Sequence, residues 1–251
     1  SKLFWIFMKK KEILAVIPAR GGSKSIVNKN IVKINGKPLI NYTIKAAIKS
    51  TFLTDVVVST DSSKIAKVAS KAGLKIPFLR PKHLSGDKVL SIQVVVHALK
   101  EMEKKNKKKY DYIVLLQPTS PLRSTKDIDL SLKKLTNSNA NSLISVTEVG
   151  GNHPNRMKKI VKGKLVNYAN LNLEDMRPRQ VLPKIYIRNG SIYASKRKLI
   201  LKNKVFAQTK SLAYVMPKER SINIDGILDL QLAKIYLKKK RKSWTWFQQT
   251  N

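Results

Sequence analysis

The chain contains no cysteine. Without thiols it can form no disulfide, no thiolate metal site and no cysteine nucleophile. A secreted scaffold held together by disulfides is therefore excluded, and we expect a cytoplasmic protein. The sequence also lacks any run of about 20 apolar residues, the length that a membrane-spanning helix requires. We therefore expect no membrane partner.

Acidic residues are scarce. There are 15 Asp and Glu against 51 Lys and Arg, which gives a formal net charge of +36 over 251 residues. Only 10 of the basic residues are Arg, the side chain on which sequence-reading nucleic-acid sites mainly rely. Excess lysine creates a diffuse positive potential that attracts any polyanion. We expect nonspecific polyanion binding at most, with no specific nucleic-acid partner.

Short apolar runs alternate with segments of helical periodicity. This alternation predicts parallel β-α-β units in a mostly parallel sheet, and hence a three-layer α/β sandwich. Asp61 or Ser62 is expected to cap the second helix. The expected strands are 13–17, 56–59, 76–79, 112–116, 142–146, 191–194 and 212–215, and the expected helices are 38–50, 62–72, 89–105, 125–135 and 227–239.

The rhythm breaks between about residues 149 and 183, where proline, glycine and arginine gather around an expected hairpin turn at 161–165. We predict an insertion here, built as an arm or an interface. The α/β domain then comprises residues 8–148 and 184–242, and the insertion residues 149–183. Met8 resembles an ordinary protein start, so residues 1–7 are expected to be an extension, as are residues 243–251.

The densest motif is the segment Pro18-Ala19-Arg20-Gly21-Gly22-Ser23-Lys24, directly after the first strand. Ligands of open α/β sheets sit at the carboxyl ends of strands. Glycines there allow backbone N–H groups to surround phosphate oxygens, and Arg20, Lys24 and Lys29 add positive charge. The spacing is neither a Walker A loop nor a dinucleotide fingerprint. Composition alone leaves open a phosphate-binding loop or a mobile basic loop.

Five motifs in order resemble those of the CMP-sialic acid synthetases, or acylneuraminate cytidylyltransferases. The resemblance covers about residues 13–237 and implies a Rossmann-like nucleotidyltransferase fold with a small dimerisation insertion. It also implies transfer of the cytidylyl group of CTP to the anomeric hydroxyl of a nonulosonic acid, with release of pyrophosphate. The motifs are residues 18–24 with Lys29-Asn30-Ile31, Val57-Val58-Ser59-Thr60-Asp61, Leu116 to Arg123, Arg188 to Tyr193, and Ser221 to Asp225 with Asp229-Leu230.

The resemblance, with the composition of the first loop, assigns roles to individual residues. The expected partners are CTP, a nonulosonic acid, a magnesium ion and a second copy of the chain, whose Arg179-Gln180 pair would help to form the sugar site. The expected nucleotide-binding residues are Arg20, Gly21, Gly22, Ser23, Lys24, Lys29, Asn30 and Ser91. The expected sugar-binding residues are Gln117, Arg179, Gln180 and Tyr193, the metal ligands are Asp225 and Asn223, and the catalytic residues are Arg20, Lys29 and Asp225. Tyr193 alternates with apolar residues, a pattern that also fits a core position.

Three positions depart from the family pattern. Asn223 stands where the family usually has Asp, which removes one anionic ligand and predicts weaker magnesium binding. Ser25 replaces a usual Gly and would be strained if this position required a positive φ; Val27 replaces a common Pro. Two alternatives stay open, namely an enzyme of the CMP-Kdo synthetase type and a catalytically weakened relative that acts as a binding protein.

Overall fold

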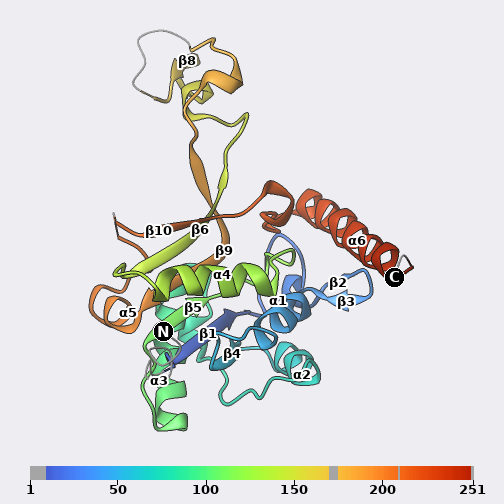
Figure 1. Ribbon diagram of the computed structural model, residues 1–251, viewed down its shortest axis with the longest axis vertical. Helices are drawn as coiled ribbons and strands as arrows, with labels where there is room; N and C mark the ends of the chain where they lie inside the picture. Colours follow the sequence, from blue (N-terminus) through green and yellow to red (C-terminus); the bar gives the residue numbers. More distant parts are fainter. Residues whose placement is uncertain (1–9, 170–174, 209, 250–251) are drawn as a thin grey trace, which may run out of the picture.

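A computed structural model of the chain describes residues 10–169, 175–208 and 210–249. It contains a six-stranded sheet in the order β10-β6-β9-β5-β1-β4, with helices on both faces (Figure 1). The sheet strands are β1 (Ile13–Pro18), β4 (Asp55–Ser59), β5 (Tyr112–Leu115), β6 (Ser142–Glu148), β9 (Tyr186–Lys196) and β10 (Leu212–Val215). The helices are α1 (Leu39–Ile48), α2 (Ser63–Lys71), α3 (Ser91–Asn106), α4 (Thr125–Thr136), α5 (Arg197–Asn203) and α6 (Ile227–Gln249).

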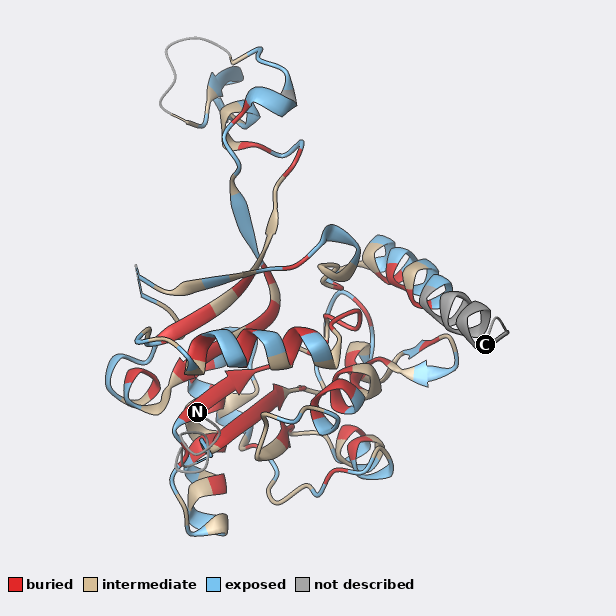
Figure 2. Ribbon diagram, in the orientation of Figure 1, coloured by how far each residue is buried: buried red, intermediate tan, exposed pale blue. Residues whose placement is uncertain are grey.

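Strand β1 shows why the molecule has three layers. Its alternate residues Ile13, Ala15 and Ile17 belong to a hydrophobic cluster with α1, α2 and α4. Leu14 and Val16 point the other way, into a cluster with α3 and α5. A strand covered on both faces needs an unbroken apolar run, and Figure 2 shows the buried residues concentrated in the sheet. The predicted three-layer α/β fold is confirmed.

Strand β9 is the exception to the parallel sheet. It pairs antiparallel with both β5 and β6, while β10–β6, β1–β4 and β1–β5 are parallel. The chain leaves β6, passes through the insertion and returns without a crossover helix, so it re-enters in the opposite direction. The sequence pattern predicts a strand at residues 191–194 that continues the parallel β-α-β order; the strand is present, but it runs antiparallel to both neighbours.

The insertion forms an arm that projects from the body on the extended ends of β6 and β9 (Figure 1). Near its tip, β7 (Lys158–Val161) and β8 (Lys164–Asn167) pair antiparallel. The turn residues Lys162 and Gly163 have φ values of 47° and 76°, as a two-residue hairpin turn requires. The hairpin predicted from residues 161–165 is therefore confirmed.

One further expectation is wrong, and one open alternative is decided. Residues 76–79 form no strand but an extended connection. Ser62 caps α2, its side chain accepting a bond from the Ile65 N–H. Lys108, between α3 and β5, pairs with Glu12 at 2.6 Å and Asp55 at 2.9 Å.

The C-terminal helix α6 is longer than the predicted 227–239. Its inner face joins the short hairpin of β2 (Lys33–Ile34) and β3 (Lys37–Pro38) and the start of α1 in a third hydrophobic cluster. Across the described ranges, no helix is long and apolar enough to cross a membrane. Residues 1–7, expected to be an extension, lie outside the described residues.

Candidate active site

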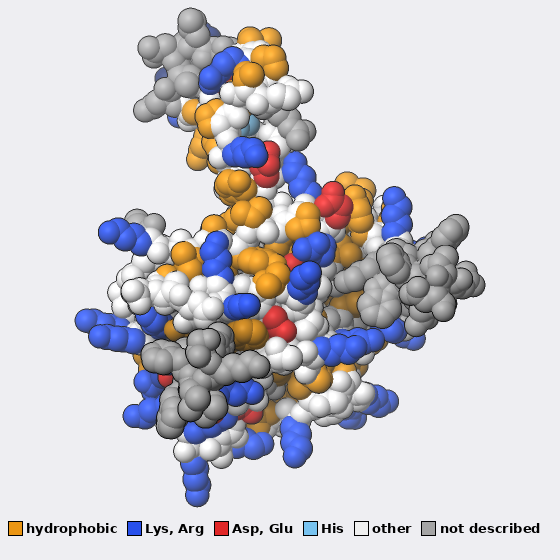
Figure 3. All heavy atoms as spheres, in the orientation of Figure 1, with side chains coloured by type: hydrophobic (Ala, Val, Ile, Leu, Met, Phe, Trp, Pro, Cys, Tyr) orange, Lys and Arg blue, Asp and Glu red, His pale blue; other side chains and the backbone are white. Residues whose placement is uncertain are grey.

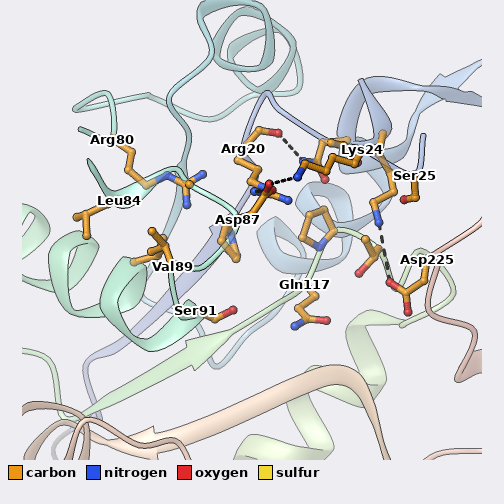
Figure 4. A pocket seen from close by; sticks show the side chains of 18 of the residues that line it. Arg20, Lys24, Ser25, Arg80, Leu84, Asp87, Val89, Ser91, Gln117 and Asp225 are labelled. Atoms are coloured by element: carbon orange, nitrogen blue, oxygen red, sulfur yellow. Dashed lines mark hydrogen bonds and ion pairs between the residues drawn. The ribbon is translucent and has the colours of Figure 1, made fainter. Parts of the chain in front are cut away.

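A cavity of about 490 Å³ opens where β1 and β5 end and α3 begins (Figure 4). This is the edge of the sheet at which an α/β fold presents loops to a ligand. Residues from four distant parts of the chain meet there. The lining comprises Pro18, Arg20, Ser23, Lys24, Ser25, Lys29, Asn30, Arg80, Leu84, Gly86, Asp87, Val89, Ser91, Val94, Gln117, Pro118, Thr119, Asn223 and Asp225.

The loop after β1 is held in place by two hydrogen bonds to its backbone. The Gly21 N–H donates to Asp61 Oδ1 at 3.0 Å, and the Asn30 amide donates to the Arg20 carbonyl at 3.0 Å. A Cβ at Gly21 would lie 3.1 Å from the Cβ of Ser62, so glycine permits this close approach, whereas a Cβ at Gly22 would meet nothing within 4 Å. Asp61 is therefore a loop-positioning residue, and Ser62 alone is the helix cap.

The departure at Ser25 causes no backbone strain. Ser25 is not among the described residues with positive φ; Asn28, three residues later, has the left-handed value of 53°. Asparagine tolerates this region better than most residues. The usual glycine is therefore not required here by the backbone conformation.

The cations of the loop face carboxylates inside the cavity. Arg20 Nη1 lies 2.5 Å and Lys24 Nζ 2.6 Å from the two carboxylate oxygens of Asp87. Hydrogen bonds from Lys24 and then Arg20 lower the pKa of Asp87 below its usual value. Lys29 Nζ donates to the Ile224 carbonyl at 3.0 Å and lies 3.9 Å from Asp225 Oδ1. The loop therefore presents three positive groups in one place.

Arg80 is a cavity residue that sequence reasoning missed. It follows the extended segment after α2, its side chain is 4% exposed, and Nη2 lies 3.8 Å from Asp61 Oδ1. Burial lowers its pKa, and within the described part of the chain its Nε and Nη2 have no hydrogen-bond partner. Figure 4 places it beside Val89 and Leu84, at the side of the cavity away from Asp225. No motif in the sequence marks this arginine.

Gln117 lies on the floor of the cavity and is fixed by its neighbours. The buried Arg123 donates to the Gln117 carbonyl at 3.2 Å and to the Ser191 carbonyl at 2.7 Å, which ties this loop to β9. Gly190, with φ of 72°, brings the backbone of β9 so close that a Cβ there would lie 2.8 Å from Gln117 Oε1. A side chain at position 190 would therefore displace Gln117.

Asn223 and Asp225 supply oxygen donors at the other end of the cavity. The Asn223 amide donates to Asp225 Oδ2 at 2.9 Å, and Asn223 Oδ1 is buried without a hydrogen-bond partner within the described residues. Asp229 accepts bonds from the N–H groups of Asp225 and Gly226 at 3.0 and 2.8 Å, and so fixes the loop. The described ranges hold no cluster of three or more His, Cys, Asp or Glu residues fit for a metal. One carboxylate and one amide oxygen suit a magnesium ion that takes its other ligands from substrate phosphates and water.

Nine predicted site residues line the cavity, and five do not. Gly21 and Gly22 lie in the loop after β1 but not in the lining. Gln180 is exposed, and Arg179 belongs with it to a short 3₁₀ helix, Arg179–Val181, in the arm. Tyr193 packs against Phe206 at 5.8 Å between ring centroids in the α3–α5 cluster, where burial raises its pKa. The nine are Arg20, Ser23, Lys24, Lys29, Asn30, Ser91, Gln117, Asn223 and Asp225.

A family model described as "Cytidylyltransferase" matches residues 14–242. The chain belongs to this family. The cytidylyltransferases are nucleotidyltransferases, so the protein is an enzyme of that class. The cavity just described lies within the residues that the family model matches.

Two relatives show how closely this cytidylyltransferase resembles characterised members. It is 34% identical over 230 residues to pseudaminic acid cytidylyltransferase of Campylobacter jejuni, covering 92% of this chain and 98% of the relative. It is 36% identical over 233 residues to CMP-N,N'-diacetyllegionaminic acid synthase of Legionella pneumophila, covering 88% and 94%. A solved CMP:2-keto-3-deoxy-manno-octonic acid synthetase in complex with CTP aligns with a TM-score of 0.68 at 15% identity, covering 91% of this chain and 99% of that one. That last likeness bears on the fold alone.

Proposed function

We propose that this enzyme joins the cytidylyl group of CTP to the anomeric hydroxyl of a nonulosonic acid and releases pyrophosphate. The observation that carries the proposal is the meeting, in one cavity, of the loop cations Arg20, Lys24 and Lys29 with Gln117 and Asp225. Relatives at 34% and 36% identity are named for pseudaminic and diacetyllegionaminic acid substrates. A free CTP carries about four negative charges, which matches a site lined by fixed cations.

In the proposed reaction the anomeric hydroxyl oxygen attacks the α-phosphorus and its proton passes to water, while the bond from that phosphorus to the oxygen bridging to the β-phosphate breaks and pyrophosphate leaves. Arg20, Lys24 and Lys29 bind the triphosphate and stabilise the charge that grows on pyrophosphate. Gln117 orients the sugar acid. In-line displacement of this kind depends on positioning and charge stabilisation and needs no protein nucleophile.

We also propose that a magnesium ion is held by the Asp225 carboxylate and the Asn223 amide oxygen. The buried, unpartnered Asn223 Oδ1 beside an exposed carboxylate supports this assignment. Bound there, the ion would supply positive charge to the phosphates of CTP. The protein's own part is to keep both oxygens on one short loop, which Asp229 fixes through the backbone.

The arm supports a homodimer. In the single chain it exposes apolar side chains to water. Among them is a cross-strand pair, Ile160 and Leu165, which are 75% and 72% exposed. Exposed apolar clusters on a projecting element are typical of an interface. We propose that the arm of a second copy buries this surface and brings Arg179 and Gln180 toward the sugar. Because CTP is a cytoplasmic metabolite, the proposal places the enzyme in the cytoplasm.

The test is pyrophosphate release from CTP and magnesium with N-acetylneuraminic, legionaminic, pseudaminic and 3-deoxy-manno-octulosonic acids supplied separately. We expect release with at least one nonulosonic acid and its loss in Asp225→Ala. Glu219→Gln, which removes one exposed charge outside the cavity, serves as control. Absence of release with every nonulosonic acid at saturating magnesium would refute the proposal. Release with the octulosonic acid alone would move the enzyme to the Kdo class.

A further inference from the structure

The cations that would bind the triphosphate already have a protein partner. Asp87 lies in the connection that leads to α3, far in sequence from the loop after β1, yet its carboxylate bridges Arg20 and Lys24. Each carboxylate oxygen takes one of the two cations, at 2.5 and 2.6 Å. Figure 4 shows this carboxylate inside the cavity, between the side chains of the loop. Asp87 therefore pairs with two of the three cations to which the proposed reaction assigns the triphosphate.

Arg20 Nη1 and Lys24 Nζ each direct a donor at the Asp87 carboxylate, so a phosphate oxygen must compete with Asp87 for these two charge-assisted bonds. The triphosphate carries about four charges against one on Asp87, so it competes strongly for the cations. Once bound, it would also repel the carboxylate. The two anions are therefore alternatives at one site.

Resting on the cytidylyltransferase function proposed above, we propose that Asp87 is an internal counter-anion. It occupies Arg20 and Lys24 while the site holds no nucleotide, and CTP must displace it. The exchange reverses when pyrophosphate leaves, because the carboxylate then recovers both cations. Asp87 thus sets the affinity for substrate and the ease of product release.

The surroundings of Asp87 allow the displacement without unpacking the core. Gly86, Asp87 and Lys88 are exposed. The local backbone bond in this connection, from the Val89 N–H to the Gly86 carbonyl at 3.2 Å, stays within the loop. The Asp87 side chain is 43% exposed and that of Lys24 84%. The side chains of Asp87 and Lys24 can therefore both move into water when a competing anion binds.

The test is the dissociation constant of CTP and of pyrophosphate, measured by titration calorimetry for wild type, Asp87→Asn and Asp87→Ala. Exposed ion pairs are weak individually, and two are removed, so we expect both ligands to bind about three- to ten-fold more tightly. Asp87→Ala guards against a new bond from the asparagine amide to phosphate, because alanine offers none. Pyrophosphate should also inhibit both variants at lower concentration than it inhibits wild type.

Glu219→Gln is the matched control, since it removes one negative charge from an exposed site outside the cavity. We expect it to change either dissociation constant by less than two-fold. If wild type binds CTP and both Asp87 variants bind it equally or more weakly, Asp87 positions the cations and the inference fails. If wild type binds no CTP, the proposed function itself fails. Tightening equal to that of the control would assign the effect to overall charge and would also overturn the inference.

Discussion

At the scale of single residues, Asn223 is the position at which this chain differs most in its chemistry from the family pattern. Its amide donates to Asp225, so the loop presents one carboxylate and one neutral oxygen. A second carboxylate would add an anionic ligand of the kind that magnesium prefers. The substitution Asn223→Asp therefore bears directly on the metal requirement.

We expect Asn223→Asp to lower the magnesium concentration that gives half-maximal pyrophosphate release, with turnover kept or raised. The measurement is a magnesium titration at saturating CTP and sugar acid. Asn35→Asp is the control, because Asn35 lies in the turn between β2 and β3, away from the cavity. A higher magnesium requirement in Asn223→Asp would show that the amide is preferred at this position.

Asp127 is a second residue with a measurable effect, this time on stability. The side chain is 1% exposed; it accepts bonds from Arg220 at 2.8 and 3.0 Å and caps α4 with Ser124. Although burial opposes it, the bonds from Arg220 and Ser124 hold the pKa of Asp127 below its usual value. The ionised carboxylate therefore stabilises the fold at pH values above its unfolded pKa, and this contribution is lost as the pH falls through the folded pKa.

We expect Asp127→Asn to reduce the free energy of unfolding at pH 7 by about 2 kcal/mol, since bonds to a charged group are weakened. The difference from wild type should begin to shrink near about pH 4, where Asp127 of the unfolded chain begins to protonate, and should be lost as the pH falls through the lower folded pKa. Urea denaturation at pH 7 and pH 3.5 measures both values. Asp111→Asn, at an exposed carboxylate that accepts a bond from the Glu12 N–H, should cost less than about 1 kcal/mol. An equal loss at both pH values would contradict the ionised role.

At the scale of elements, β1 and β9 show what periodicity can predict. The unbroken apolar run of β1 predicts a strand buried on both faces, and the structure has one. The run at residues 191–194 also predicts a strand, but its four residues carry no information about the direction of that strand. Direction depends on how the chain returns from the arm. Residues 76–79 show the opposite error, since an apolar run there connects two elements without a strand partner to pair with.

The residues of the candidate site also fall into two groups, those that the sequence predicts and those that it does not. Motif residues such as Arg20, Gln117 and Asp225 could be predicted because each stands directly after an expected strand or in a matching signature. Arg80 and Asp87 reach the cavity through long connections. Arg80 pairs with Asp61, 19 positions earlier in the chain, and Asp87 pairs with Lys24 and Arg20, 63 and 67 positions earlier. Such pairings arise from tertiary structure and leave no local pattern.

The arm is the element whose surface can be tested. Ile160 and Leu165 face each other across β7 and β8 and are both exposed. We expect the double substitution Ile160→Glu/Leu165→Glu to shift the protein from dimer to monomer, because four buried charges, two from each copy, would disfavour the interface. Light scattering after size-exclusion chromatography measures the mass. Leu228→Glu, at a leucine of α6 that is 80% exposed, is the control. A wild-type monomer at micromolar concentration would contradict the dimer.

At the scale of the whole molecule, the net positive charge of the chain is much larger than the charge of the cations that line the cavity. Figure 3 shows Lys and Arg side chains spread over the visible face of the body, with hydrophobic side chains on the arm and at its base. A handful of cations line the cavity, while the formal net charge is +36. The remainder creates a long-range field that favours the approach of any anion.

We therefore expect kcat/KM for CTP to fall several-fold between about 0.02 and 0.3 M KCl, while kcat changes little, because salt screens the approach more than the bound state. Magnesium is held constant, and potassium acetate replaces KCl in a parallel series to exclude a chloride effect. A polyanion such as heparin should compete with CTP most strongly at low salt. A flat kcat/KM would show that the surface charge has no part in substrate capture.

Strand β9 connects two distant parts of the molecule. Its first residues, Tyr186 and Ile187, are exposed at the stem of the arm, and four residues after Tyr186 Gly190 lies against Gln117. A change in the position of the arm would therefore be transmitted through the backbone of β9 to Gln117 on the cavity floor. The rate per chain should then depend on protein concentration, falling on dilution as pairs separate and recovering when the same sample is concentrated again.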